Sequence, residues 1–335
     1  MFSLRGKSYL VTGGTGFIGA GLVKGLVAAG ARVRSLDNDS RGSRDKLGST
    51  ANEVELIVGD IRDATTVARA LQGMDGVCHL AYINGTEFFY TKPDLILEVA
   101  VKGMMNVIEG CLQQNVPELV LASSSEVYQT PPRVPTDETA PLVVPDVLNP
   151  RYSYGGGKII SELLALNYGR ARLRRVLVFR PHNVYGPSMG WEHVIPQFAL
   201  RVRELHRRQP HGVLSFPIQG TGQETRSFIY IDDMIDGVLR VMDRGEHLGI
   251  YHIGSGEETT VKSLATAVAR CYGRDIVIVA GALRPGGTLR RCPDITKLRG
   301  LGFVPGVSLV DGLEKTVRWY DENAHLKLDN PDKTI

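Results

Sequence analysis

Short apolar runs alternate with longer stretches of helical spacing over the first half of the chain. The runs are rich in β-branched residues, which indicates buried strands, and the segment from Phe17 to Ala29 has the apolar spacing of a helix. Strands that alternate with helices predict an α/β fold built on a doubly wound parallel Rossmann sheet. The predicted strands are Ser8–Thr12, Arg32–Asp37, Val54–Gly59, Gly76–Leu80, Glu118–Ala122 and Arg175–Arg180.

The texture of the chain changes after Pro181. Gly- and Pro-rich loops and short strands follow, with two amphipathic helices expected at Val261–Tyr272 and Leu309–Asn323. We therefore expect a Rossmann domain over residues 1–181, with returning segments near 225–253. A smaller, irregular α/β domain over residues 182–335 is expected to cover the carboxyl ends of the sheet.

The predicted helix Asp94–Asn115 carries apolar residues almost all round. One helix face is enough to pack against a sheet, so a second apolar face indicates a partner helix. Together with a second expected helix, Ser153–Arg170, it predicts a homodimer whose interface is a four-helix bundle.

Composition narrows the possibilities further. The 335 residues contain no apolar stretch of membrane-spanning length and no signal-peptide pattern, which predicts a cytoplasmic protein without a membrane partner. A net charge of +3 is too small to indicate nucleic-acid binding. The four cysteines have neither disulfide nor metal-ligand spacing, so they are expected to be small buried side chains and no metal site is predicted.

A glycine-rich loop joins the first predicted strand to the first helix. Gly13–Gly19 has GxxGxxG spacing, which permits a tight turn and lets the backbone approach a phosphate that faces the helix N-terminus. The second strand ends at Asp37, whose carboxylate suits the adenosine-ribose hydroxyls and repels a 2′-phosphate. We therefore expect NAD as the cofactor. Arg41 and Arg44 follow closely and leave recognition of the 2′-phosphate of NADP as the alternative.

Tyr154 and Lys158 lie four residues apart, so on a helix they share one face. A neighbouring ammonium and a positively charged nicotinamide both favour the phenolate form of a tyrosine, which makes Tyr154 a candidate base. A solvent-exposed helix pair is the alternative. The glycines between these residues argue against that alternative, because each destabilises a helix unless something approaches its backbone closely. Ser123–Tyr128 follows the fifth predicted strand and presents hydroxyls where such a sheet binds ligands.

The order of these motifs resembles that of the extended short-chain dehydrogenases/reductases, and within them the NAD-dependent nucleotide-sugar epimerase and dehydratase branch. The resemblance spans nearly the whole chain. Besides the glycine loop, Asp37, the serine-rich segment and YxxxK, it rests on Gly59–Asp63, His79–Ala81, Arg180–Pro187 and Arg226–Asp233.

The resemblance implies roles for individual residues. It makes Tyr154 the catalytic base, Ser124 the catalytic hydroxyl and Lys158 the residue that holds the nicotinamide ribose, with Glu126 as a further catalytic candidate. The implied cofactor site comprises Gly13, Gly16, Phe17, Ile18, Gly19, Asp37, Asp60, Ile61, Leu80, Ala81, Tyr154 and Lys158. The implied site for a nucleotide-sugar substrate comprises Ser124, Ser125, Asn183, Arg226 and Arg284.

The chain departs from the family pattern at several positions. Ala100 stands where an asparagine is usual, Gly157 replaces a serine or threonine before the lysine, and Gln129 replaces a glycine. Ser125 replaces the aspartic acid that 4,6-dehydratases use to protonate the leaving oxygen O6, whereas Glu126 matches the motif of UDP-glucuronate decarboxylases. Serine is a far weaker acid than aspartic acid.

These features favour epimerisation at C4 of a nucleotide sugar through a transient 4-keto sugar. Decarboxylation of the UDP-glucuronate type and 4,6-dehydration are the alternatives, and a non-catalytic NAD-binding regulator is a remote one. Two aromatic segments, Phe88–Tyr90 and Trp191–His193, are candidates either for walls of the sugar pocket or for core of the smaller domain.

Overall fold

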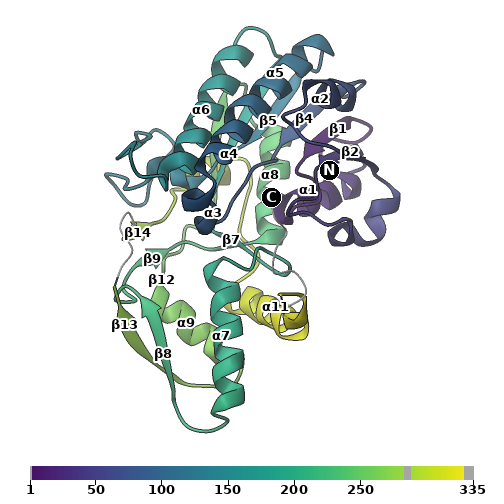
Figure 1. The fold of residues 1–335 in the computed structure, drawn as a ribbon. Helices are drawn as coiled ribbons and strands as arrows, with labels where there is room; N and C mark the ends of the chain where they lie inside the picture. The colour runs from purple at the N-terminus through teal and green to yellow at the C-terminus, as the bar shows by residue number, and fades with distance from the viewer. Residues whose placement is uncertain (1, 283–287, 328–335) are drawn as a thin grey trace.

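The computed structural model describes residues 2–282 and 288–327. Within these ranges, seven parallel strands form the main sheet (Figure 1). This confirms the predicted α/β fold, and the ends of the predicted strands agree with the observed ones within one residue. In sheet order the strands are β11 (Gly249–Ile253), β6 (Arg175–Pro181), β5 (Glu118–Ala122), β4 (Gly76–His79), β1 (Ser8–Thr12), β2 (Arg32–Asp37) and β3 (Glu55–Val58).

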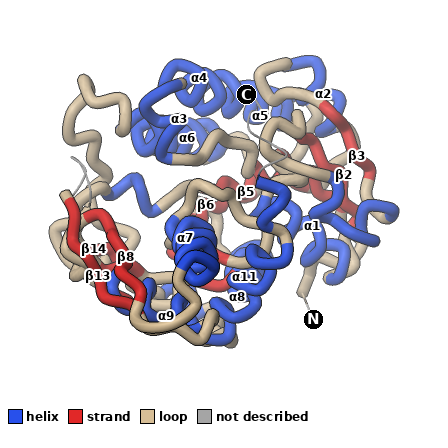
Figure 2. The backbone as a smooth tube through the Cα atoms, turned by 60° about the horizontal axis from the view of Figure 1, so that its bottom comes forward, coloured by secondary structure: helices blue, strands red, loops and turns tan. Residues whose placement is uncertain are grey.

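Helices cover both faces of this sheet (Figure 2). Successive strand residues point to opposite faces and supply two separate cores: Val11 and Cys78 pack on one side, Leu10 and Val77 on the other. Because both faces are buried, the strands are continuous apolar runs. On the first side lie α1 (Phe17–Ala28) and α8 (Ile231–Arg244), and on the second lie α2 (Ala64–Leu71), α4 (Pro93–Glu98), α5 (Met104–Gln113) and α6 (Tyr152–Gly169).

The single helix predicted at Asp94–Asn115 is instead composed of α4, a π-helical turn η2 (Val99–Gly103) and α5. The helix passes very close to the loop after β3 at this point. A Cβ atom on Gly103 would lie 2.4 Å from Cδ1 of Ile61. Hydrophobic spacing did not indicate the wide turn, because the contact that accompanies it comes from a distant segment.

The chain beyond β6 forms small sheets and a third apolar core that includes Phe216 and Leu264. Two of its helices, α9 and α11, are the ones predicted from sequence, whereas β11 returns to the main sheet. The division into domains at residues 181 and 182 stays a prediction. The elements here are β7 (Val184–Tyr185), α7 (Val194–Arg208), β8 (Leu214–Gln219), β9 (Thr225–Arg226), β10 (Ile229–Tyr230), β12 (Thr259–Thr260), α9 (Val261–Arg270), β13 (Ile276–Gly281), β14 (Arg290–Arg291), α10 (Thr296–Gly300), α11 (Leu309–Glu322) and η4 (Ala324–Lys327).

Three further short elements belong to the half of the chain that precedes β6. They are η1 (Arg44–Asn52), α3 (Thr86–Thr91) and η3 (Ser125–Tyr128). Among the described residues, no helix is long and apolar enough to cross a lipid bilayer.

The outer face of α4, η2 and α6 leaves apolar side chains exposed to solvent. Leu163 is 56% exposed, and Leu97, Val101, Ile160 and Tyr168 are exposed as well. These helices pack side by side (Figure 1). The sheet therefore covers only their inner faces, which is the arrangement expected if a second copy covers the outer ones.

We predict that the chain forms a homodimer through this outer face. Leu163→Lys places a charge on the predicted interface and should convert the dimer into a monomer, as measured by light scattering at micromolar concentration. Val310→Lys, at an exposed valine of α11, should leave the mass unchanged. A monomeric unsubstituted protein would contradict the prediction.

Candidate active site

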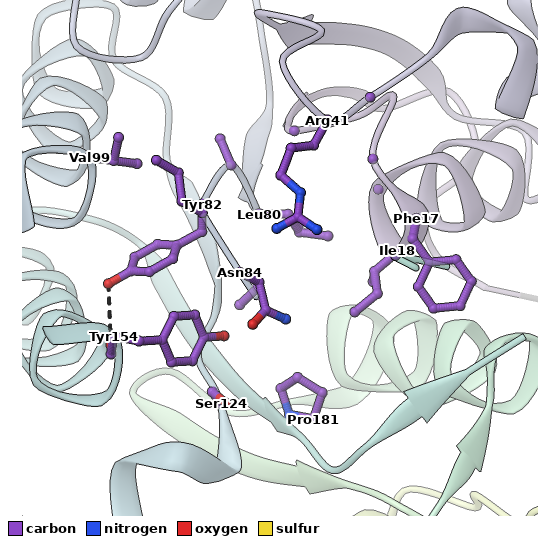
Figure 3. A pocket seen from close by; sticks show the side chains of 18 of the residues that line it. Phe17, Ile18, Arg41, Leu80, Tyr82, Asn84, Val99, Ser124, Tyr154 and Pro181 are labelled. Carbon is purple, nitrogen blue, oxygen red and sulfur yellow. Dashed lines mark hydrogen bonds between the residues drawn. The ribbon is translucent and has the colours of Figure 1, made fainter. Parts of the chain in front are cut away.

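A cavity of about 470 Å³ lies at the carboxyl ends of the parallel strands (Figure 3). It is lined by nearly all the residues that the sequence nominated: Gly13, Gly16, Phe17, Ile18, Gly19, Asp37, Asp60, Ile61, Leu80, Ala81, Ser124, Ser125, Glu126, Tyr154, Lys158 and Asn183. Arg226 lies outside this lining, and Arg284 lies outside the described residues. Residues as distant in the sequence as Gly13 and Asn183 thus line one cavity, as a doubly wound sheet requires.

The glycine loop is packed too closely for side chains. Gly13 has a φ of +74°, and a Cβ atom there would lie 2.8 Å from the backbone of Ala81. At Gly19 a Cβ atom would lie 1.9 Å from the carbonyl oxygen of Gly13. Helix α1 begins at Phe17 without a side-chain cap, so the N–H groups of its first turn are available to an anion. The loop therefore fits the pyrophosphate of a dinucleotide.

Asp37 ends β2 at the cavity wall. Its carboxylate accepts hydrogen bonds from the backbone N–H groups of Thr15 and Asp39, each at 3.0 Å, and keeps lone pairs for ribose hydroxyls. The Nη2 atom of Arg41 donates to the Glu192 carboxylate at 3.0 Å, and Arg44 is exposed. One terminal nitrogen of the Arg41 guanidinium is thus engaged by a carboxylate of the chain itself.

Asp60 follows β3 and forms an ion pair with Arg62, with 2.8 Å between Oδ2 and Nη2. This pairing lowers the pKa of the Asp60 carboxyl, which keeps the group ionised. Asn38 also donates to this carboxylate, at 3.2 Å. The Asp60 segment and the Asp37 segment are therefore linked directly at this end of the cavity.

Tyr154 lies on α6 at the opposite end of the cavity (Figure 3). Its ring stacks on Phe89, with centroids 4.7 Å apart, and meets the Tyr82 ring edge-on at 5.2 Å. Burial raises the pKa of the Tyr154 phenol to about 12, although a hydrogen bond with the Ser124 hydroxyl acts in the opposite direction. Burial thus outweighs the cations that the chain itself places nearby.

Lys158 lies one turn further along α6 and is buried. Its Nζ atom donates to the carbonyl oxygen of Ala122 at 2.8 Å and lies 3.7 Å from the centroid of the Tyr82 ring. Burial lowers the pKa of Lys158 to about 7, while the charge of Glu162 raises it. Tyr154 and Lys158 therefore do not form the exposed helix pair that was the alternative.

The serine-rich end of β5 turns into η3 next to Tyr154. Ser124 caps this turn, because its hydroxyl accepts a hydrogen bond from the N–H of Glu126 at 3.1 Å. The Glu126 carboxylate pairs with Arg291 at 2.6 Å and with Arg151 at 3.9 Å. Burial alone would raise the pKa of Glu126, but these arginines and Arg226 hold it below its usual value.

Two residues nominated for the substrate are held by backbone carbonyls. The side-chain amide of Asn183 donates to the carbonyl oxygen of Ser227 at 2.8 Å. Arg226 donates to the carbonyl oxygens of Thr225 and Thr288 at 2.7 and 2.6 Å. Burial lowers the pKa of Arg226 to about 10, and the neighbouring Arg291 acts in the same direction.

Sequence reasoning missed Arg291 and did not choose among the aromatic residues. Arg291 is buried and lines the cavity, whereas the adjacent Arg290 is exposed and pairs with Glu258. The sequence Arg290-Arg291 alone does not show which of the two arginines faces the cavity. Of the two candidate segments, Phe89 and His193 line the cavity, whereas Trp191 packs against Trp319 in the third core.

Comparisons with known proteins agree with this geometry. Residues 9–254 match the profile of the NAD dependent epimerase/dehydratase family. UDP-glucuronic acid decarboxylase 2 of Arabidopsis thaliana is 31% identical over 320 residues, which cover 94% of this chain and 68% of the relative.

Two solved structures are similar over most of their length. A dTDP-glucose 4,6-dehydratase from Streptomyces venezuelae with NAD bound has a TM-score of 0.84 and 31% identity, covering 95% of this chain and 98% of that one. A UDP-glucose 4-epimerase from Thermotoga maritima with UDP-glucose has a TM-score of 0.83 and 27% identity, covering 95% of this chain and 99% of that one.

These relatives have three different activities at similar identity, so similarity alone does not decide the reaction. All of them are nucleotide-sugar enzymes, and the matched family is NAD dependent, which confirms NAD as the cofactor. The chain is therefore an enzyme and belongs to the NAD-dependent epimerase/dehydratase family of the extended short-chain dehydrogenases/reductases.

Proposed function

We propose that the enzyme interconverts C4 epimers of a nucleotide sugar. The observation that carries the proposal is the state of the groups next to Tyr154. Of the described residues that line the cavity, Glu126 is the carboxylate at this end, and it is paired with Arg291 at 2.6 Å. The cavity thus holds a hydroxyl, a phenol and an ammonium for alcohol–ketone chemistry, and the carboxylate beside them is occupied.

In this proposal Tyr154 takes the proton from the sugar O4, while the Ser124 hydroxyl, which already hydrogen-bonds the phenol, holds that oxygen. Lys158 holds the nicotinamide ribose. When bound, NAD accepts the hydride from C4 and returns it, and its positive nicotinamide favours the phenolate form of Tyr154. Once the 4-keto sugar has turned over in the cavity, Tyr154 returns the proton to O4 of the epimer, so no further acid or base is required.

The substrate's diphosphate is proposed to lie beside Asn183 and Arg226. Both side chains are fixed by backbone carbonyls, and Arg226 keeps its charge because even the lowered pKa of about 10 is well above neutrality. Guanidinium groups suit a diphosphate because their planar N–H donors match its oxygens. Arg284 stays a proposal from sequence for the same role.

Elimination of water from C5 and C6 needs an acid for O6. Ser125 occupies the position of that acid, and Glu126 is ionised because its arginines lower the pKa of the carboxyl. An ionised carboxylate held by two guanidinium groups neither donates a proton nor accepts one readily. The site is therefore poorly equipped for 4,6-dehydration.

Decarboxylation of a uronic acid is the second candidate, and one observation favours it. No described residue accepts a hydrogen bond from Nε of Arg291 or Nε of Arg151, although both atoms are buried. Together with Arg226, these arginines carry three positive charges beside the single negative charge of Glu126. The excess positive charge suits a substrate carboxylate. A 4-keto uronic acid is a β-keto acid and loses carbon dioxide without an acid at Ser125.

The products of a nucleotide-sugar panel test the proposal. Incubated with UDP-, GDP-, dTDP- and CDP-sugars that include uronic acids, the enzyme should yield a product of unchanged mass with an inverted C4 proton coupling by NMR. Loss of carbon dioxide would replace this conclusion with decarboxylation. Loss of water would show that a serine-containing site expels O6.

We predict that Tyr154→Phe lowers kcat by about 10²- to 10⁴-fold and leaves the Kd for NAD unchanged, because the hydroxyl serves only proton transfer. Lys158→Ala should lower kcat and also weaken NAD binding, because the ammonium is proposed to bind the nicotinamide ribose as well. Tyr152→Phe, two residues earlier on α6 and outside the cavity lining, is the matched control and should retain kcat. Retention of more than a few per cent of kcat by Tyr154→Phe would mean that another group is the base.

We also predict a preference for NAD over NADP that depends on Asp37. Asp37→Ala removes the acceptor of the ribose hydroxyls and the repulsion of a 2′-phosphate, and should reduce the ratio of the two affinities by about 10- to 100-fold. Calorimetric titration of both cofactors measures this ratio. Equal affinities for NAD and NADP in the unsubstituted enzyme would refute the assignment.

A further inference from the structure

Lys158 has an unusual aromatic neighbour. Tyr82 lies three residues after His79, the last residue of β4, and its ring centroid lies 3.7 Å from Nζ of Lys158. A cation this close to the face of an aromatic ring is attracted by the negative potential of that face. The ammonium therefore has two favourable contacts in the chain, the Tyr82 ring and the carbonyl oxygen of Ala122.

One departure from the family pattern near this site, Gly157, makes room for the same tyrosine. A Cβ atom on Gly157 would lie 2.3 Å from the Tyr82 hydroxyl oxygen and 2.8 Å from Cβ of Ala100. A serine or threonine at position 157 would therefore collide with Tyr82. The hydroxyl also faces the carbonyl oxygen of Tyr154 at 3.4 Å, which is a long, weak hydrogen bond (Figure 3).

We propose that Tyr82 is a positioning residue for Lys158: its ring face holds the ammonium against the end of β5, and its hydroxyl fits the space left by the absent side chain of Gly157. The inference rests on the proposed role of Lys158 and not on which sugar the enzyme converts.

The contact matters because Lys158 is poised between its charged and neutral forms. Burial lowers the pKa of Lys158 to about 7, so loss of a contact that favours the ammonium leaves the amine largely neutral at neutral pH. The other groups that face it do not replace the ring. Glu162 raises the pKa from α6, but it is shared with Arg180, and His79 on β4 is neutral because burial lowers the pKa of that imidazole to about 3.

The sharpest test keeps the shape of the ring and changes its charge distribution. We would replace Tyr82 by phenylalanine and by phenylalanines with one, two or three ring fluorines in the full NAD-loaded chain. The Nζ titration of Lys158 is then followed by NMR of [¹⁵N]lysine-labelled protein, with the signal assigned through Lys158→Arg. Fluorine withdraws electrons from the ring face but barely alters burial, so any shift reports on the cation–π contact.

We expect Tyr82→Phe to retain the pKa of Lys158, and the trifluorinated ring to lower it by about one unit, a tenfold change in the equilibrium. The alkaline limb of the kcat profile should move to lower pH by the same amount, because the ammonium is the active form. The NMR readout needs no turnover, so it stands even if the proposed reaction is wrong. An unchanged Lys158 titration across the fluorinated series would overturn the proposal.

A pair of glycine variants gives an independent check. Gly157→Ala should displace the Tyr82 ring and lower the pKa of Lys158, whereas Gly156→Ala should not, because a Cβ atom there would have only an ordinary 3.6 Å contact with Val144. Both changes raise helix propensity equally, so a difference between them is not a general effect on α6. The same Lys158 titration in both variants would contradict the role of Tyr82.

Discussion

A buried ion pair between Arg180 on β6 and Glu162 on α6 holds the reacting groups together. Both side chains are 2% exposed, and their closest atoms are 2.6 Å apart. Glu162 also accepts a hydrogen bond from Ser123, next to the proposed catalytic hydroxyl, and Arg180 donates to the hydroxyl of Tyr128 at the end of η3. Tyr128 in turn contacts His252 on β11 at 2.6 Å. Removal of one charge from such a pair costs about 3–5 kcal/mol, since its partner is left buried and uncompensated.

The network fixes α6 against η3, and the glycines of α6 allow that close approach. A Cβ atom on Gly155 would lie 2.7 Å from the side-chain nitrogen of Gln129 and 3.0 Å from the carbonyl oxygen of Glu126. Gln129 itself adopts a φ of +52°, a conformation that favours glycine, which is the residue usual there in the family. Gly155 thus lowers the helix propensity of α6 at the point where Tyr154 meets the serine-rich turn. No close contact explains the glycine at position 156.

Features of the fold that depend on neighbouring residues could be predicted from the sequence. The strands, the glycine loop and the placement of Asp37 follow from apolar runs, absent side chains and the common carboxyl edge of a parallel sheet. The pairing of Arg291 with Glu126 spans 165 positions and left no periodic signal. The rise in the pKa of Tyr154 is not visible in the sequence either, because burial by Phe89 and Tyr82 depends on packing that spacing does not reveal.

The central claim is that bound NAD oxidises and then reduces C4, with Ser124, Tyr154 and Lys158 moving the O4 proton and holding the reactants, while the rest of the sugar stays intact. The most direct measurement is the fate of hydrogen isotopes in the product, read by mass spectrometry and NMR. A nucleotide sugar deuterated at C4 and converted in ordinary water should keep its deuterium at C4. The unlabelled sugar converted in deuterium oxide should acquire none on carbon. Solvent deuterium on C5 or C6 of the product would contradict the account, because it would require carbon–hydrogen bonds to form away from C4.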